Sequence, residues 1–112
     1  MIGIYMIQCK LNNKIYIGSS KDVLNRLKCH KYSLNNYKHN NKYLQNDWNK
    51  YKEENFIFKL IEKCNVYNLL EREQYYIEFY LSVQREYGYN ILCNQKCLEN
   101  IQEKLNKVKN HI

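Results

Sequence analysis

The stretch Gly3-Ile4-Tyr5, with Tyr16-Ile17-Gly18 about ten residues further on, decides how this chain is expected to fold. The two tripeptides take two of the three glycines in the 112 residues. Glycine allows another group to approach the backbone closely or allows a positive φ angle. Each tripeptide also carries a tyrosine, and the separation fits one hairpin. We therefore expect two neighbouring strands that present two phenols to a common site.

The remaining pattern predicts an α+β domain with a small, mostly antiparallel sheet, with helices partly covering one face or both. Helices are inferred from apolar residues three and four apart, and strands from alternation. The expected stripe of the first helix is Val23, Leu27 and Leu34, helped by Leu24, with Ser20 or Asp22 as N-cap. Strands are expected at 2–9, 14–18 and 56–61. The first helix is expected to run from its N-cap to about Leu34, and further helices are expected at 42–52 and 67–82, with a turn at 85–90 and an amphipathic tail helix within 95–112.

Composition indicates a single domain with a polyanionic partner. The net charge is +7, which favours nucleic acid. The alternative is an AT-rich coding sequence, which overproduces Lys, Asn, Ile and Tyr. We divide the chain into a domain at 1–94 and a short amphipathic helix or tail at 95–112. The tail either packs on the domain or awaits a partner.

The five cysteines form no paired framework, and the sequence has no signal peptide, so a reduced, intracellular (cytoplasmic) protein is expected. No apolar run reaches the roughly 20 residues that cross a bilayer, so no membrane association is expected. Cys93 and Cys97, with Cys29 and His30, form a less favoured candidate for a zinc site.

Arg26 and His30 are four residues apart, which places them on one helix face, taken to be separate from that of Val23 and Leu27. An arginine beside a histidine is suited to clamping a phosphate, because the guanidinium offers a rigid fork of donors. The alternative is an ordinary solvated helix face.

Glu73 stands out because it lies on the expected apolar stripe of its helix. Leu69, Leu70, Tyr76 and Ile77 are its neighbours at three and four residues, whereas Arg72 and Glu78 would face water. Burying a carboxylate costs several kcal/mol unless it is paired or binds a metal. A metal ligand and an ion pair with Arg26 or a lysine remain equally open.

Taken together, the two tripeptides, Arg26 and the later helical Glu73 closely resemble the GIY-YIG nuclease superfamily. The resemblance runs from about Ile2 to Asn90, and it is closest to the phage and organellar intron-homing branch because of His30, His39 and the ending at Asn90. The excision-repair branch commonly has a lysine after the second tripeptide. This chain has Ser19 and Ser20 there, so a lysine-assisted mechanism is not expected.

The resemblance implies a three-stranded antiparallel sheet flanked by helices and a metal-dependent endonuclease that hydrolyses DNA phosphodiester bonds. One divalent ion, Mg²⁺ or Mn²⁺, would be bound by Glu73, with no small-molecule cofactor. Tyr5 and Tyr16 would activate or position the attacking water, and Tyr5 is slightly favoured as the base. Arg26 would hold the scissile phosphate, and His30 would relay a proton to or from the tyrosine.

Three further residues complete the implied site. Gly18 supports the tyrosines, Asn90 fixes the metal site or a strand end, and His39 assists at the edge. Homing enzymes of this type carry a separate, longer recognition region, and this chain continues only about 22 residues beyond Asn90. We therefore expect low specificity unless a partner or a dimer supplies recognition. The competing hypotheses are an inactive nucleic-acid-binding module that retains the fold, and an interaction protein whose charge reflects genome composition.

Overall fold

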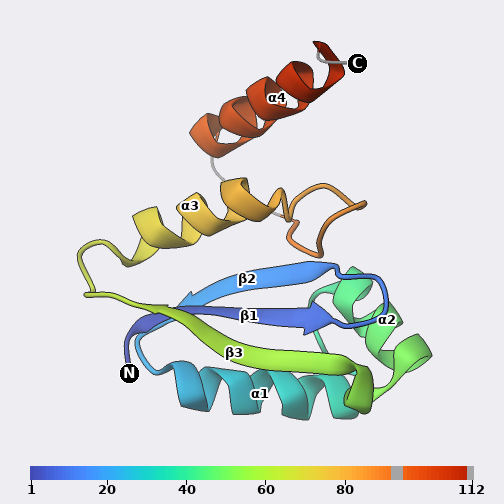
Figure 1. Cartoon of the computed structure of the whole chain (residues 1–112). Helices are drawn as coiled ribbons and strands as arrows, with labels where there is room; N and C mark the ends of the chain where they lie inside the picture. Colours follow the sequence, from blue (N-terminus) through green and yellow to red (C-terminus); the bar gives the residue numbers. More distant parts are fainter. Residues whose placement is uncertain (92–94, 111–112) are drawn as a thin grey trace.

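The computed structural model describes the backbone of residues 1–91 and 95–110 and the side chains of residues 1–91 and 99–107. A three-stranded antiparallel sheet, in the order β2-β1-β3, lies between helices (Figure 1). The elements are β1 (Gly3–Cys9), β2 (Ile15–Ser20), α1 (Val23–Asn35), α2 (Lys42–Tyr51), a 3₁₀ turn (Glu53–Asn55), β3 (Phe56–Lys63), α3 (Leu69–Tyr80) and α4 (Gln95–Asn110). The predicted α+β class and three-stranded sheet are confirmed.

The hairpin of β1 and β2 places the two tripeptides side by side. Tyr5 is opposite Gly18, and Ile7 is opposite Tyr16. Since positions 5 and 7 of a strand face the same way, the two phenols lie on one face of the sheet. The prediction that two neighbouring strands present their tyrosines together is confirmed.

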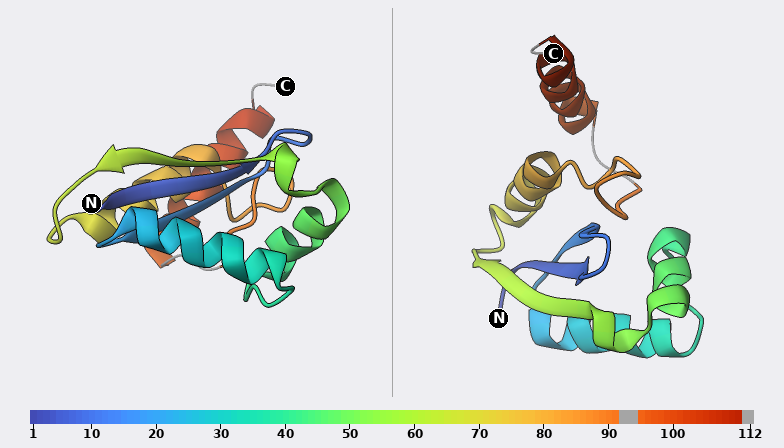
Figure 2. Two further views of the ribbon diagram at one scale, coloured as in Figure 1. Left: turned by 90° about the horizontal axis from the view of Figure 1, so that it is seen from below. Right: turned by 45° about the vertical axis from the view of Figure 1, so that its right-hand side comes forward.

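Both faces of the sheet are covered. Ile4 and Met6 pack with Ile17 of β2, Ile77 of α3 and Ile101 of α4. Ile7 and Cys9 point the other way, into a second cluster that includes Leu34, Leu44 and Trp48 of α1 and α2. Figure 2 shows α1 and α3 on opposite sides of the sheet. The sheet is therefore a partition between two cores, and each face takes alternate residues of β1.

Some sequence predictions about the helices are wrong in detail. Leu24 and Leu70, expected on apolar stripes, are 58% and 71% exposed. His30, expected on a face apart from Val23, is instead buried, because it follows Val23 by seven residues and so returns to the same side of α1. Helix α3 ends at Tyr80, since Leu81 adopts a left-handed conformation (φ 54°) as the C-cap.

The tail helix packs on the domain through Ile101, which is buried, and Leu105. Leu98 and Val108, which continue the three- and four-residue spacing of Ile101 and Leu105, lie outside the described side chains. No helix within 1–91 and 95–110 has the length and apolar character needed to cross a membrane.

Candidate active site

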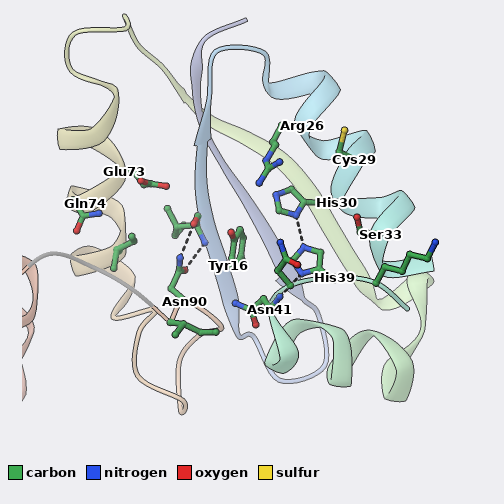
Figure 3. Close-up of a pocket in the computed structure, with 15 residues that line it drawn as sticks. Tyr16, Arg26, Cys29, His30, Ser33, His39, Asn41, Glu73, Gln74 and Asn90 are labelled. Atoms are coloured by element: carbon green, nitrogen blue, oxygen red, sulfur yellow. Dashed lines mark hydrogen bonds between the residues drawn. The ribbon is translucent and has the colours of Figure 1, made fainter. Parts of the chain in front are cut away.

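A cavity of about 390 Å³ opens on the sheet edge formed by β2, between α1 and α3 (Figure 3). Arg26 and His30 reach it from α1, Glu73 from α3 and Tyr16 from β2. The predicted site residues that line it are Tyr16, Arg26, His30, His39, Glu73 and Asn90. The remaining two, Tyr5 and Gly18, are buried in the strands beside it. The fold thus gathers residues from five separate segments around one cavity: β2, α1, the loop before α2, α3 and the segment after α3.

Gly18 is required by the position of Tyr5. A Cβ atom at residue 18 would lie 2.3 Å from both Cζ and Oη of the Tyr5 phenol, far inside contact distance. Gly3 is similarly constrained, because a Cβ there would lie 2.3 Å from the carbonyl oxygen of Glu62. None of the three glycines has a positive φ. Close approach, the first of the two reasons considered from sequence, is therefore the one that applies.

A chain of polar contacts runs from the buried tyrosine to the loop before α2. Tyr5 Oη is 2.6 Å from His30 Nε2, and His30 Nδ1 is 2.7 Å from His39 Nε2. The backbone N–H of Asn41 donates to His39 Nδ1 at 3.0 Å. The Tyr16 ring makes T-shaped contacts with the imidazoles of His30 and His39, with ring centroids 5.4 and 6.3 Å apart.

The titration properties of this cluster follow from burial. Burial lowers the pKa of His30 to about 3, and the neighbouring His39 and Arg26 add to the effect. The pKa of His39 is lowered, again first by burial. Burial also raises the pKa of Tyr5 and of Tyr16, and Arg26 partly offsets the rise in both. At neutral pH both imidazoles and both phenols are therefore uncharged.

The two tyrosines differ in access. Tyr5 is only 1% exposed and does not line the cavity, whereas Tyr16 does. The slight preference for Tyr5 as the base came from the resemblance alone. The placement favours Tyr16 as the phenol that can contact a substrate or water directly.

Glu73 faces the cavity from α3, on the side opposite Arg26 (Figure 3). Burial raises the pKa of its carboxyl, and hydrogen bonds with the side chain and backbone of Ser19 work against that rise. The two ion pairs found within residues 1–91 and 95–110 involve neither Glu73 nor Arg26. The ion-pair interpretation of Glu73 therefore finds no support in the described part of the chain.

A metal ion is compatible with this arrangement. Mg²⁺ typically binds one or two carboxylates and completes its shell with water and substrate phosphate oxygens. A partly desolvated carboxylate with no cationic partner among the described residues meets that requirement. No group of three or more histidine, cysteine or acidic side chains gathers within the described residues, which fits a site completed by water and substrate. Cys93 and the Cys97 side chain, which the alternative zinc site would need, lie outside the described residues, so that alternative stays a prediction.

Asn90 holds the edge of β2. Its side chain accepts a hydrogen bond from the backbone N–H of Ile17 and donates one to the carbonyl of the same residue, at 2.8 and 2.9 Å. The backbone N–H of Tyr89, the residue before Asn90, donates to the carbonyl of Ile15 on the same strand. These contacts continue the sheet beyond its edge strand and keep Tyr16 in place. Of the two roles implied for Asn90, fixing a strand end agrees with this geometry.

Sequence reasoning missed three residues that build the site. Asn41 caps α2 by accepting from Leu44 N–H and also donates to the Tyr89 carbonyl and to His39. Gln45 accepts from the backbone N–H of His39, and Ser19 contacts Glu73. An asparagine directly before a predicted helix is a capping signal that would have identified Asn41. No sequence signal marks the other two, because their partners are distant in the chain.

Known proteins resemble this chain in sequence. Residues 1–90 match the model of the GIY-YIG catalytic domain. The chain is 36% identical over 91 residues to Intron-associated endonuclease 1 of Enterobacteria phage T4, covering 80% of this chain and 36% of that protein. The chain thus spans about a third of the length of that relative.

Two solved structures also resemble the fold. The catalytic domain of the homing endonuclease I-TevI matches with a TM-score of 0.75 and 34% identity, covering 83% of this chain and all of that one. A glutamate-to-alanine mutant of the same catalytic domain matches with a TM-score of 0.74 and 33% identity, covering 84% and 96%. With a family model that spans most of its length, this chain belongs to the GIY-YIG catalytic domain family.

Proposed function

We propose that this domain is a DNA endonuclease that hydrolyses phosphodiester bonds with the help of one divalent ion, Mg²⁺ or Mn²⁺. The observation that carries the proposal is the pair formed by Arg26 and Glu73, which lie across one cavity without an ion-pair partner among the described residues. Held apart in this way, the guanidinium of Arg26 can bind a phosphate anion, and the carboxylate of Glu73 can bind a metal cation that accompanies that phosphate. The net charge of +7 favours a polyanionic substrate.

Each cavity residue has a role in the proposed reaction. Arg26 holds the scissile phosphate and stabilises the charge that develops on it. Glu73 provides the carboxylate that binds the ion. The ion would act there as a Lewis acid toward the phosphate oxygens. Tyr16 lies in the cavity and orients the attacking water, while the Tyr5 phenol, behind it, keeps His30 and Arg26 in position.

The raised pKa of Tyr16 limits what it does before substrate binds. An ordinary phenol is ionised about one part in a thousand at pH 7, and burial makes ionisation rarer still. The neutral phenol oxygen therefore accepts a hydrogen bond from water. Only the phenolate could take up the proton of the water, so the neutral Tyr16 positions the water without deprotonating it, and Arg26, which lowers the pKa of this phenol, favours the ionised form.

Substrate recognition is part of the proposal. The relatives named above are intron or homing endonucleases, and we propose a homing or mobile-element role for this chain as well. The domain by itself is expected to cleave with low sequence specificity. A further segment, a partner or a dimer would then supply recognition.

The test is nicking of supercoiled plasmid with Mg²⁺ or Mn²⁺, beside EDTA. Glu73→Ala should abolish nicking, and Glu71→Ala is the matched control, because Glu71 is an exposed glutamate on the same helix. Metal-dependent nicking lost only in Glu73→Ala supports the proposal. DNA binding without cleavage, unaffected by metal or by Glu73→Ala, would instead identify an inactive binding module.

A further inference from the structure

The contacts among Asn41, His39, His30 and Tyr5 form an unbranched series in which each ring nitrogen has one partner. The series begins at a backbone N–H, that of Asn41, which donates to His39 Nδ1. It continues from His39 Nε2 to His30 Nδ1 and ends between His30 Nε2 and Tyr5 Oη. A backbone amide only donates, so the first hydrogen bond has a fixed direction.

That fixed direction determines every later one. A neutral imidazole has one N–H and one bare nitrogen. Because His39 Nδ1 accepts from Asn41, His39 must carry its hydrogen on Nε2 and donate to His30 Nδ1. His30 Nδ1 is then the bare nitrogen, and the hydrogen of His30 is on Nε2, directed at Tyr5. The opposite assignment would point two N–H groups at each other at His39 Nδ1.

We propose that His39 is a positioning residue that fixes His30 in its Nε2–H tautomer, so that His30 donates a hydrogen bond to Tyr5 Oη. The role in cleavage rests on the proposed function, whereas the tautomer itself does not. His39 is oriented independently of His30, because its backbone N–H donates to Gln45 Oε1 and Gln45 Nε2 donates to the carbonyl of Leu34. The lowered pKa values of both histidines keep them neutral, as the assignment requires.

The consequence differs from a proton relay. His30 Nε2 already carries a hydrogen and so does not accept the proton of Tyr5. The oxygen of Tyr5 instead accepts from His30 and interacts with the Arg26 guanidinium. Tyr5 thereby holds the phosphate-binding arginine and the histidine in one arrangement beside Tyr16.

The tautomer is measured directly by long-range ¹H–¹⁵N NMR of the full chain, labelled with ¹⁵N-histidine and without metal or DNA. His30→Asn and His39→Gln spectra assign the signals. We expect a bare Nδ1 and a protonated Nε2 in both His30 and His39 at pH 7. A protonated Nδ1 in His30 would overturn the proposal. The readout needs no cleavage, so an inactive protein with the expected tautomer would refute the proposed function alone.

Three variants of similar size test the role in cleavage. His39→Gln can still donate to His30 and accept from Asn41. His39→Met is neutral and cannot donate, and His39→Glu accepts from His30, which reverses the tautomer. We expect His39→Gln to nick plasmid within about tenfold of wild type, and the other two to lose on the order of 10²-fold, since a wrong tautomer or a misplaced group has effects of at least that size.

Circular dichroism of each variant checks that it is folded. The ¹⁵N spectrum of folded His39→Glu should show hydrogen on His30 Nδ1, which a purely structural role for His39 does not predict. Equal activity in folded Gln, Met and Glu variants would overturn the positioning role.

Discussion

Two arginine and glutamate sets in this molecule are arranged in opposite ways. Arg72 donates two hydrogen bonds of 2.7 Å to Glu62, and Tyr76 adds a third to the same carboxylate at 2.9 Å. Arg26 and Glu73 instead lie on opposite sides of a cavity, and neither takes part in an ion pair within the described residues. In the first set the guanidinium and the carboxylate form an ion pair. In the second set the cavity separates the two charged groups.

The difference extends to the protonation of the two carboxyls. The Arg72 guanidinium lowers the pKa of Glu62, whereas burial raises the pKa of Glu73. Arg72 and Glu73 are consecutive residues of α3, so the helix turns one toward its partner on β3 and the other toward the cavity. Residue type does not distinguish a paired charge from one that faces a cavity. What lies opposite each side chain does.

The largest effect is expected for Glu73→Gln. Nicking should fall by at least about 10³-fold, because a metal ion contributes several kcal/mol of transition-state stabilisation. The unfolding free energy measured in urea without metal should stay unchanged or rise, since the variant removes a partly desolvated charge. A clear loss of stability would indicate that Glu73 is a structural residue like Glu62.

Arg26→Lys is expected to reduce nicking by about 10²-fold, because lysine lacks the bidentate fork that matches a phosphate. Arg26 is exposed on α1, so the unfolding free energy should change little. Single-turnover nicking rates at saturating enzyme measure the first effect. Cleavage by Arg26→Lys at the wild-type rate would contradict this prediction.

Acid should lower the unfolding free energy of the domain through the buried histidines of the cavity before it affects the Arg72 and Glu62 set. His30 has its ordinary pKa near 6.5 when unfolded and one near 3 when folded, so the unfolded state binds a proton first as pH falls. Stability is therefore full above pH 6.5 and decreases below it by up to about 1.4 kcal/mol per pH unit. The lowered pKa of His39 acts in the same direction.

Urea unfolding at pH 7 and pH 5 measures this loss, and His30→Asn serves as the reference because it removes the group that titrates. Wild type should lose about 2 kcal/mol more than the variant over this interval. Equal pH dependence in both would show that His30 does not stay neutral when folded.

The smallest effect is expected for Arg72→Lys, the matched control for Arg26→Lys. Nicking should be unaffected, because Arg72 points away from the cavity toward Glu62. The midpoint of thermal unfolding should drop slightly, as one bidentate contact and the packing of the guanidinium on Tyr75, 4.4 Å from the ring centroid, are lost. A strong loss of cleavage in this variant would remove the distinction between the two sets.

Much of the fold was predictable because it depends on local pattern. Alternation along β1 gave the strand and its two faces, and Val23, Leu27 and Leu34 gave the buried side of α1. Leu24 and Leu70 were misplaced because apolar character alone does not show which side of a helix the sheet will cover. The predicted separation of His30 from the face of Val23 is wrong, because seven residues make almost two full helical turns and return His30 to the buried side.

The sequence by itself determined the hairpin with its two tyrosines and the order of strands and helices. Through the resemblance it also pointed to six of the residues that line the cavity, namely Tyr16, Arg26, His30, His39, Glu73 and Asn90. Only the tertiary structure decided that Tyr16 rather than Tyr5 reaches the cavity, that Glu73 has no ion-pair partner among the described residues, and that Asn41 and Gln45 orient His39. Periodicity and motif spacing record which face of an element a residue occupies. Access, pairing and the direction of a hydrogen bond depend on what another segment places opposite that face, and this is fixed only when the segments pack.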